Sequence, residues 1–316
     1  MGSQDASSRG SNGHFSKHLL PWTMAIVWPL MCTLPLLLTI ENSPTHYKSI
    51  FPKHWYLVNP DVSLVNEPKP LGLILGILAV FVGHVFLVPM FYLFRKGYLS
   101  GGEEPKSIQS TGARNYFFSE GLVSHLSQPE GFVLLALYLS ITWMYNLMPR
   151  AYYSFEGGIQ WSKVLTCLAT QDGLQYAMHR LEHRVSPEFY KVSHKPHHRF
   201  TNPRLFDAFN GSITDTALMI LVPLYATANI VRDCNVWTYM AFGSMYANWL
   251  VLIHSEYVFP WDTLFRRFGL GTPGDHHVHH KVFKYNYGHL FMWFDRIWGT
   301  YKDPQVFAPK LFNKGV

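Results

Sequence analysis

The chain has 316 residues, of which 48% are hydrophobic and 16% aromatic, while only 15% carry a charge; charged residues make up about a quarter of an average soluble protein. The net charge of +6 is modest and the basic residues are interleaved with histidine-rich segments, which argues against a nucleic-acid partner. Cys32, Cys167 and Cys234 form no CxxC or secreted pairing pattern, so neither a disulfide framework nor a thiolate metal site is predicted.

The first half of the chain alternates polar segments with apolar runs. Residues 1–18 are rich in Ser and Gly, and we expect them to be disordered. The uncharged run 19–40 is long enough to span a hydrocarbon core of about 30 Å. Residues 41–70 are expected to form a polar loop, 71–94 a second span, and 95–130 another loop.

The next two segments are predicted to bring the chain to a functional site. The apolar run 131–148 is a third candidate span, and 158–178 is a fourth that carries several polar side chains. Polar residues within a membrane segment usually face the interior of the helix bundle. Asp172 shares helical spacing with His179 and His183, so we expect its carboxylate to orient a metal-binding histidine; an amphipathic helix on the membrane surface is the alternative.

Two apolar runs, 213–231 and 236–253, are separated by only four residues and predict a transmembrane hairpin. A hairpin leaves the membrane on the side where it entered, so the segments before and after it lie on one face. That face is predicted to hold 1–18, 95–130, 179–212 and 254–316, with 2, 4, 6 and 8 Lys/Arg. The opposite face is predicted to hold 41–70, 149–157 and the tip of the hairpin, with 3, 1 and 1 Lys/Arg.

The positive-inside rule places the more basic face in the cytosol. The sequon that begins at Asn210 lies on this face, and we therefore expect it to carry no glycan. The number of spans is predicted to be between four and six.

Histidine is concentrated on the same face: 11 of the 17 histidines fall between positions 179 and 289. In a helix, residues at i, i+3 and i+4 share one face. The histidines repeat these spacings in two clusters, at 194–198 and 276–280, and His179 and His183 form a pair at i and i+4. His254 follows the hairpin between the clusters. The nine candidate ligands are His179, His183, His194, His197, His198, His254, His276, His279 and His280.

Neutral imidazole suits iron, zinc, copper and nickel, and one tetrahedral zinc takes three or four protein ligands. Nine imidazoles are about twice that number, so the pattern predicts a dinuclear centre. Carboxylate-bridged di-iron bundles instead use Glu and Glu-x-x-His pairs, which are absent at matching positions. A histidine-bound pair of redox metals that activates dioxygen is the interpretation that remains.

The motifs HRLEH, HKPHH and HHVHH, with the later NYG and DRIWGT segments, resemble the fatty acid hydroxylase/sterol desaturase superfamily over about residues 130–303, and sterol C5-desaturases most closely. The resemblance implies an all-α integral membrane protein, a transmembrane helix bundle with a cytosolic histidine-rich helical cap that holds two metal ions. We expect an N-terminal membrane region at 19–128, a catalytic domain at 129–303 and a tail at 304–316.

The resemblance further implies a di-iron site at the endoplasmic reticulum membrane with the nine histidines as ligands. It implies O2 as co-substrate, and electrons from NAD(P)H through cytochrome b5 and its reductase. The chain lacks the HPGG haem motif of a fused cytochrome b5 domain, so the donor is expected to be a separate protein. The substrate is expected to be a sterol-pathway lipid that is desaturated, hydroxylated or epoxidised.

One stretch departs from the sterol-acting relatives. These usually carry a histidine before a proline ahead of the hairpin, where this chain reads Phe209-Asn-Gly-Ser-Ile213. The departure is compatible with an offshoot of the superfamily that epoxidises squalene. A fatty-acyl or sphingolipid hydroxylase is an alternative. A zinc-dependent membrane hydrolase, with Glu182 as general base of an H-x-x-E-H motif, and a non-catalytic scaffold are remote ones.

Several residues beside the motifs are assigned supporting roles. Glu256, Asp275 and Asp295 flank ligand segments and are candidates for fixing histidine tautomers; His277 and His289 are expected to support the site without binding metal. His84 is expected to be a buried polar contact within an apolar run. The segments 143–145 and 239–249 are candidate linings of the path for an apolar lipid, although aromatic belts at the membrane interface have the same composition.

Overall fold

The computed structural model describes residues 46–56, 70–100, 102, 105–109 and 116–308. Within these residues the chain is helical, with two isolated β-bridges and no strand. The predictions for 1–18 and 19–40 and most of the tail lie outside the described residues. The α-helices are α2 His46–Ile50, α3 Pro70–Arg95, α4 Phe118–Leu126, α5 Leu134–Met144, α6 Trp161–Glu182, α7 Pro187–Val192, α8 Lys195–His198, α9 Ile213–Thr216, α10 Val222–Ile230, α11 Val236–Leu252, α12 Asp262–Arg267, α13 Pro273–Val282, α14 Trp293–Ile297 and α15 Pro304–Phe307.

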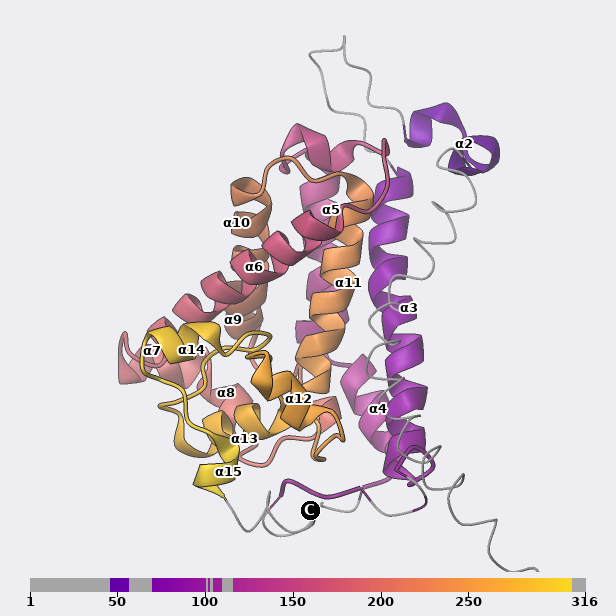
Figure 1. The fold of residues 1–316 in the computed structure, drawn as a ribbon. Helices are drawn as coiled ribbons and strands as arrows, with labels where there is room; N and C mark the ends of the chain where they lie inside the picture. Colours follow the sequence, from indigo (N-terminus) through magenta and orange to yellow (C-terminus); the bar gives the residue numbers. More distant parts are fainter. Residues whose placement is uncertain (1–45, 57–69, 101, 103–104, 110–115, 309–316) are drawn as a thin grey trace, which may run out of the picture.

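Helix α11 lies at the centre of the bundle, with α3 along one side and α6 crossing the other (Figure 1). Small residues allow α3 to approach closely: Gly72 lies under the Trp143 ring, and the Ser244 hydroxyl of α11 donates a 2.7 Å hydrogen bond to the Ala79 carbonyl. Helices α10 and α11 form the two arms of the predicted hairpin. Helix α6 packs against both of them.

Among the described residues, two helical stretches are long and apolar enough to cross a membrane, α3 and the stretch Ile213–Ile230. The latter consists of α9, a π-helical turn at Ala217–Leu221 and α10. The predicted spans 131–148 and 236–253 correspond to the shorter helices α5 and α11. Helix α3 turns side chains such as Ile77, Phe81 and Val85 outward, where they are about half exposed.

Both predicted loops contain helix, and in this respect the predictions were wrong. Residues 41–70 include α2 and a 3-10 turn at Lys53–Trp55, and 95–130 includes α4. Helix α4 is stabilised by packing against residues distant in the sequence. The rings of Phe118 and Phe206 meet edge to face with centroids 5.1 Å apart. Tertiary packing of this kind has no periodic signature in a short segment.

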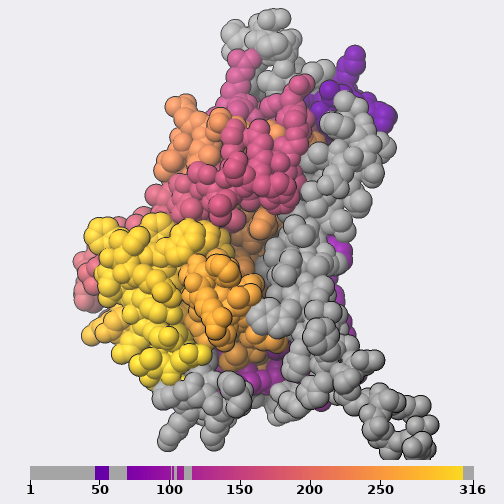
Figure 2. Space-filling model, in the orientation of Figure 1, coloured from indigo at the N-terminus to yellow at the C-terminus, as the bar shows by residue number. Residues whose placement is uncertain are grey.

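The histidine-bearing segments lie at one end of the bundle. The C-terminal ends of α6 and α11 and the start of α9 reach the end where α8 and α13 are found (Figure 1). Figure 2 shows the C-terminal residues as a continuous surface over this end. The arrangement agrees with the predicted parity, in which the segments on either side of the hairpin share one face.

The close approach of α3 to Trp143 gives a test of the packing. A Cβ atom at Gly72 would lie 2.0 Å from Trp143 Cζ2, so we expect Gly72→Ala to lower the free energy of unfolding by about 1–3 kcal/mol through overpacking. Gly243 on α11 is the matched control, since its added Cβ meets nothing within 4 Å. Thermal unfolding in detergent measures both; equal stability of the two variants would contradict this packing.

Candidate metal centre

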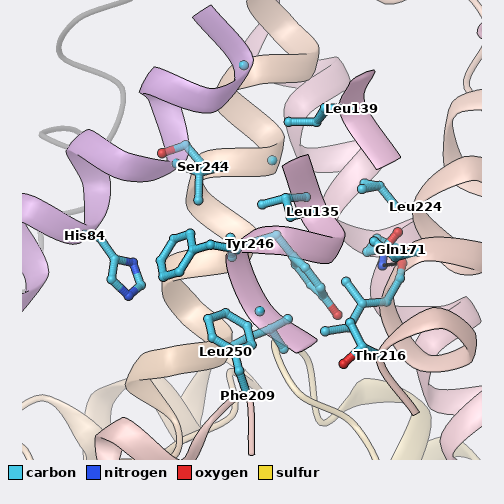
Figure 3. Close-up of a pocket in the computed structure, with 18 of the residues that line it drawn as sticks. His84, Leu135, Leu139, Gln171, Phe209, Thr216, Leu224, Ser244, Tyr246 and Leu250 are labelled. Atoms are coloured by element: carbon cyan, nitrogen blue, oxygen red, sulfur yellow. Dashed lines mark hydrogen bonds between the residues drawn. The ribbon is translucent and has the colours of Figure 1, made fainter. Parts of the chain in front are cut away.

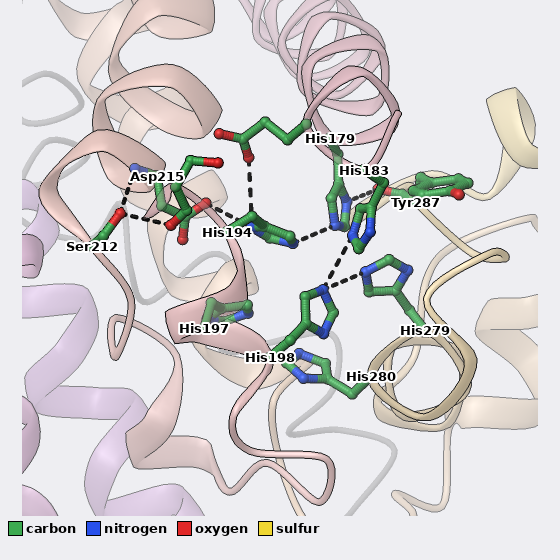
Figure 4. Close-up of polar contacts among 12 residues, drawn as sticks. His179, His183, His194, His197, His198, Ser212, Asp215, His279, His280 and Tyr287 are labelled. Atoms are coloured by element: carbon green, nitrogen blue, oxygen red, sulfur yellow. Dashed lines mark hydrogen bonds and ion pairs between the residues drawn. The ribbon is translucent and has the colours of Figure 1, made fainter. Parts of the chain in front are cut away.

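Five of the predicted ligands form one group. Helix α6 supplies His179 near its end and His183 just after it, His194 and His198 come from the segment around α8, and His279 comes from α13. One nitrogen from each lies within 4.8 Å of the others. Neighbouring Nε2 atoms are 2.9 Å apart for His179 and His194, and 3.0 Å apart for His198 and His279 (Figure 4).

The other four predicted ligands form a second group, again with ligand atoms within 4.8 Å of one another. The Nε2 atom of His276 is 2.9 Å from that of His254 and 3.0 Å from that of His280, and His197 approaches His254 at 3.3 Å. The rings of His198 and His280 connect the groups with a centroid separation of 4.7 Å. The nine imidazoles therefore divide into sets of five and four.

Hydrogen bonds on the outer side of the rings fix the tautomers. The Nδ1 atom of His179 donates to the Tyr287 carbonyl at 2.8 Å, and Nδ1 of His194 donates to the Asp215 carboxylate at 2.7 Å. A neutral imidazole has one N–H, so the Nε2 atoms of both rings carry lone pairs. These lone pairs face each other across 2.9 Å with no proton to share. His254, His279 and His280 likewise donate through Nδ1 to backbone carbonyls.

Facing lone pairs repel unless a cation lies among them, so the donor set fits a bound metal. Metal–imidazole bonds are about 2.0–2.1 Å long, which places neighbouring ligand nitrogens about 3 Å apart. Imidazoles without carboxylates in the inner layer suit iron or another transition metal. With ligands divided between two groups, the site fits two ions.

Burial opposes protonation of most of these rings. Of the nine, eight are buried and His183 is partly exposed. Desolvation, with the neighbouring imidazoles, holds the pKa of His198 and of His279 well below the usual value, and lowers the pKa of His197 to about 4. The lone pairs are therefore available to metal at neutral pH without competition from protons.

A carboxylate that the sequence analysis missed supports His194. Asp215 accepts the His194 Nδ1–H, and its position is set at the start of α9, where its backbone N–H donates to the Ser212 hydroxyl at 3.0 Å (Figure 4). The signal was available: Asp215 is an acid inside an otherwise apolar run, and such acids are usually functional. Glu182 lies on the same outer side, with Oε2 3.5 Å from His194 Nδ1.

This position of Glu182 bears on the hydrolase alternative. A general base in an H-x-x-E-H site must face the metal and its bound water, whereas Glu182 approaches the side of His194 that points away from the cluster. The geometry therefore gives the remote hydrolase hypothesis no support.

Asp172 and Asp295 hold the backbone around the cluster. Contrary to the expectation, Asp172 touches no ligand imidazole: it accepts the backbone N–H groups of Leu290 and Phe291 at 2.7 and 2.9 Å. Asp295 accepts the N–H groups of Tyr287 and Gly288 at 2.9 and 2.7 Å. The Gly288 N–H shares its peptide group with the Tyr287 carbonyl, which receives the His179 Nδ1–H. Asp295 thus positions His179 through one intervening peptide.

The remaining two carboxylates act locally. Asp275 caps α13 in a reciprocal arrangement with Thr272, whose hydroxyl donates to it at 2.6 Å. Glu256 accepts the Tyr116 hydroxyl at 2.8 Å and the Leu205 N–H at 3.1 Å. Neither carboxylate contacts a ligand imidazole, so the expectation that they fix histidine tautomers was wrong.

Three histidines to which the sequence analysis gave supporting or buried roles lie outside both groups. The Nδ1–H of His277 donates to the Pro273 carbonyl at 3.1 Å, and His277 belongs to neither group. His289 is buried beside both groups, with ring centroids 5.1 Å from His179 and 5.3 Å from His276. His84 is the buried polar contact expected, with nitrogens 3.0 Å from Asn248 Oδ1 and 2.9 Å from His125 Nε2.

An apolar pocket lies within the bundle (Figure 3). Its lining includes Leu135, Leu139 and Leu224 with the aromatic Tyr239 and Tyr246, as expected for segment 239–249. A smaller pocket continues from it and reaches His194, His197, His254 and His289. The two pockets share Phe209, Thr216, Ile220 and Leu250. Trp143 lies outside the lining, packed against Gly72 and Tyr153.

Residues 164–300, which include all nine histidines of the two groups, match the family model for fatty acid hydroxylases. The chain is 65% identical over 298 residues to the alternative squalene epoxidase of Phaeodactylum tricornutum, covering 94% of this chain and 84% of the relative. This chain belongs to the fatty acid hydroxylase family.

More distant relatives include sterol enzymes. The Delta(7)-sterol 5(6)-desaturase ERG3B of Gibberella zeae is 31% identical, over 47% of this chain and 45% of the relative. The lathosterol oxidase of Rattus norvegicus is 27% identical, over 83% of each chain. No solved structure matches this chain.

The contact between Asp215 and His194 predicts a loss of metal. We expect Asp215→Asn to weaken metal binding by about 10- to 100-fold, because the charge that raises the basicity of His194 is removed. Release of metal to a chelator measures this effect. Asp262→Asn is the matched control, since Asp262 is also buried and accepts the Phe259 N–H at 3.0 Å. Equal chelator resistance of both variants and the parent protein would contradict the role of Asp215.

Burial of neutral imidazoles predicts a pH dependence. Because the pKa of His197 and of His277 falls from 6.5 to about 4 in the folded protein, the unfolded chain binds more protons than the folded one between these values. Stability and metal retention should therefore decrease as pH falls from about 6.5 towards 4. Thermal unfolding and metal content across this range measure it; a stability that rises on acidification would contradict neutral, buried rings.

Proposed function

We propose that this protein is a membrane-bound di-iron squalene epoxidase. The observation that carries the proposal is the apolar pocket together with the smaller pocket beside it, which shares part of its lining and reaches ligands of both histidine groups. The 65% identity to an alternative squalene epoxidase favours epoxidation over desaturation, since the two sterol desaturase and oxidase relatives described above reach only 31% and 27%.

The reaction joins one atom of O2 to both carbons of a C=C bond, and the other atom leaves as water after two electrons and two protons are consumed. The bound iron pair would supply the activation of O2. The nine imidazoles would hold it, with Asp215 and the Tyr287 carbonyl fixing the direction of His194 and His179.

The chain's own contribution is position and exclusion of water. Leu135, Leu139, Leu224 and Leu250 offer an apolar lining along which a hydrocarbon chain can lie. Phe209 and Ile220 belong to both pockets and would define where the reacting double bond meets the metal groups. Small differences in this placement decide which bond reacts.

Membrane location and electron supply complete the proposal. The two apolar stretches, α3 and Ile213–Ile230, support an integral membrane protein. We place it in the endoplasmic reticulum with the histidine end facing the cytosol, following the excess of Lys and Arg on that side. Cytochrome b5 and its reductase are the proposed electron donors.

Expression in yeast strains that lack either squalene epoxidase or sterol C5-desaturase tests the function. We expect rescue of the first strain and accumulation of 2,3-epoxysqualene in its membranes, detected by mass spectrometry, and no rescue of the second. His197→Ala and His279→Ala each remove a proposed metal ligand. We expect rescue to be lost and the amount of epoxide to fall at least about 100-fold, while the protein still inserts in the membrane.

His277→Ala is the control variant, because His277 is buried in the same cap yet lies outside both groups. Rescue of only the desaturase strain would contradict epoxidation. Product formation by both ligand variants would contradict the metal centre.

A further inference from the structure

The smaller pocket, where the apolar path meets the histidine groups, contains one uncommitted polar atom. Among the described side chains that line it, Nδ1 of His289 is the buried polar atom without a hydrogen-bond partner. His289 belongs to neither ligand group. A buried polar atom left without a partner costs about 1–3 kcal/mol, so its presence at this place calls for an explanation.

Most other polar side chains of this pocket have hydrogen-bond partners; Gln175, for example, accepts the Tyr246 hydroxyl. His194 is held by Asp215, and its Nε2 faces His179. His197 and His254 face each other within the four-histidine group. A molecule that enters from the apolar pocket therefore meets hydrocarbon side chains, the Thr216 hydroxyl where the two pockets adjoin, committed ligands and the buried Nδ1 atom of His289.

The backbone at His289 is fixed. Its N–H and that of Leu290 donate to Asp172 Oδ1 at 3.3 and 2.7 Å, and its carbonyl accepts the Trp249 indole N–H at 3.2 Å. The ring lies beside one member of each histidine group, His179 and His276. This chain thus places a preorganised imidazole next to both groups without including it in either.

We propose that His289 is a catalytic residue that touches the reacting end of the lipid, where Nδ1–H donates a hydrogen bond to the oxygen atom of the oxygenated product, an epoxide in a long apolar chain. The inference rests on the proposed function, and names the side chain that recognises the oxygenated carbon pair. The parent hydrocarbon has no acceptor, so His289 distinguishes oxygenated from unoxygenated lipid.

Binding of the two lipids to the iron-loaded protein tests this assignment. The probes are squalene and 2,3-epoxysqualene, and the variants are His289→Leu, which removes the donor, and His289→Asn, whose amide N–H replaces Nδ1–H. We expect His289→Leu to weaken epoxide binding by about 10- to 100-fold, the value of one buried hydrogen bond, with squalene binding changed by less than about threefold. His289→Asn should restore epoxide binding to within about fivefold of the parent protein.

The control is His277→Leu, which replaces a second buried histidine that also has an unpartnered ring nitrogen but lies off both pockets. It should bind both lipids as the parent protein does. Metal content is measured for every variant and should be unchanged.

Two results would overturn the inference. Equal epoxide binding by His289→Leu and the parent protein would show that the ring does not touch the product, and loss of iron from both His289 variants would make it a ligand or a structural support instead. Failure of the parent protein to form epoxide in yeast defeats the proposed function, whereas epoxide formation with unaltered binding in His289→Leu defeats this inference alone.

Discussion

The histidine end of the fold is organised around a repulsion between imidazole lone pairs, which the protein's own groups do not relieve. Nine imidazoles converge in two sets, and the outer hydrogen bonds of rings such as His179 and His194 leave lone pairs facing each other at 2.9 Å. Burial prevents protonation from removing the conflict. Cations at the centres of the two sets would make the arrangement favourable, and metal binding would then stabilise the folded form of this end of the protein.

The residues outside the ligand sets hold this arrangement together. Asp215 fixes one imidazole directly, while Asp295 does so through the peptide group between Tyr287 and Gly288. Asp172, at the middle of α6, gathers the N–H groups of residues 289–291 and so ties the chain after α13 to the bundle. The same hydrogen bonds also position part of the lining of the smaller pocket, because His289 belongs to that segment. The contacts of Asp172 therefore both hold the segment next to the histidine groups and shape the smaller pocket.

The sequence predicted what depends on local spacing and on chain parity. Histidines at i, i+3 and i+4 do share a face at α13, and the segments flanking the hairpin do meet at one end. It did not predict contacts between distant segments. The role of Asp215 was missed although it is an acid in an apolar run, and Asp172 binds backbone instead of imidazole. The contact of His84 with His125 joins the consecutive helices α3 and α4 across a long connection. Such pairings depend on tertiary packing, which leaves no periodic mark on either segment.

X-ray absorption spectroscopy of the purified native protein, combined with its metal content, tests the central claim most directly. The account predicts two irons per chain with a first shell dominated by imidazole nitrogen at about 2.0–2.2 Å, and a second iron as a resolved scatterer. A single metal per chain, or a first shell composed mainly of carboxylate oxygen or thiolate sulfur, would contradict it.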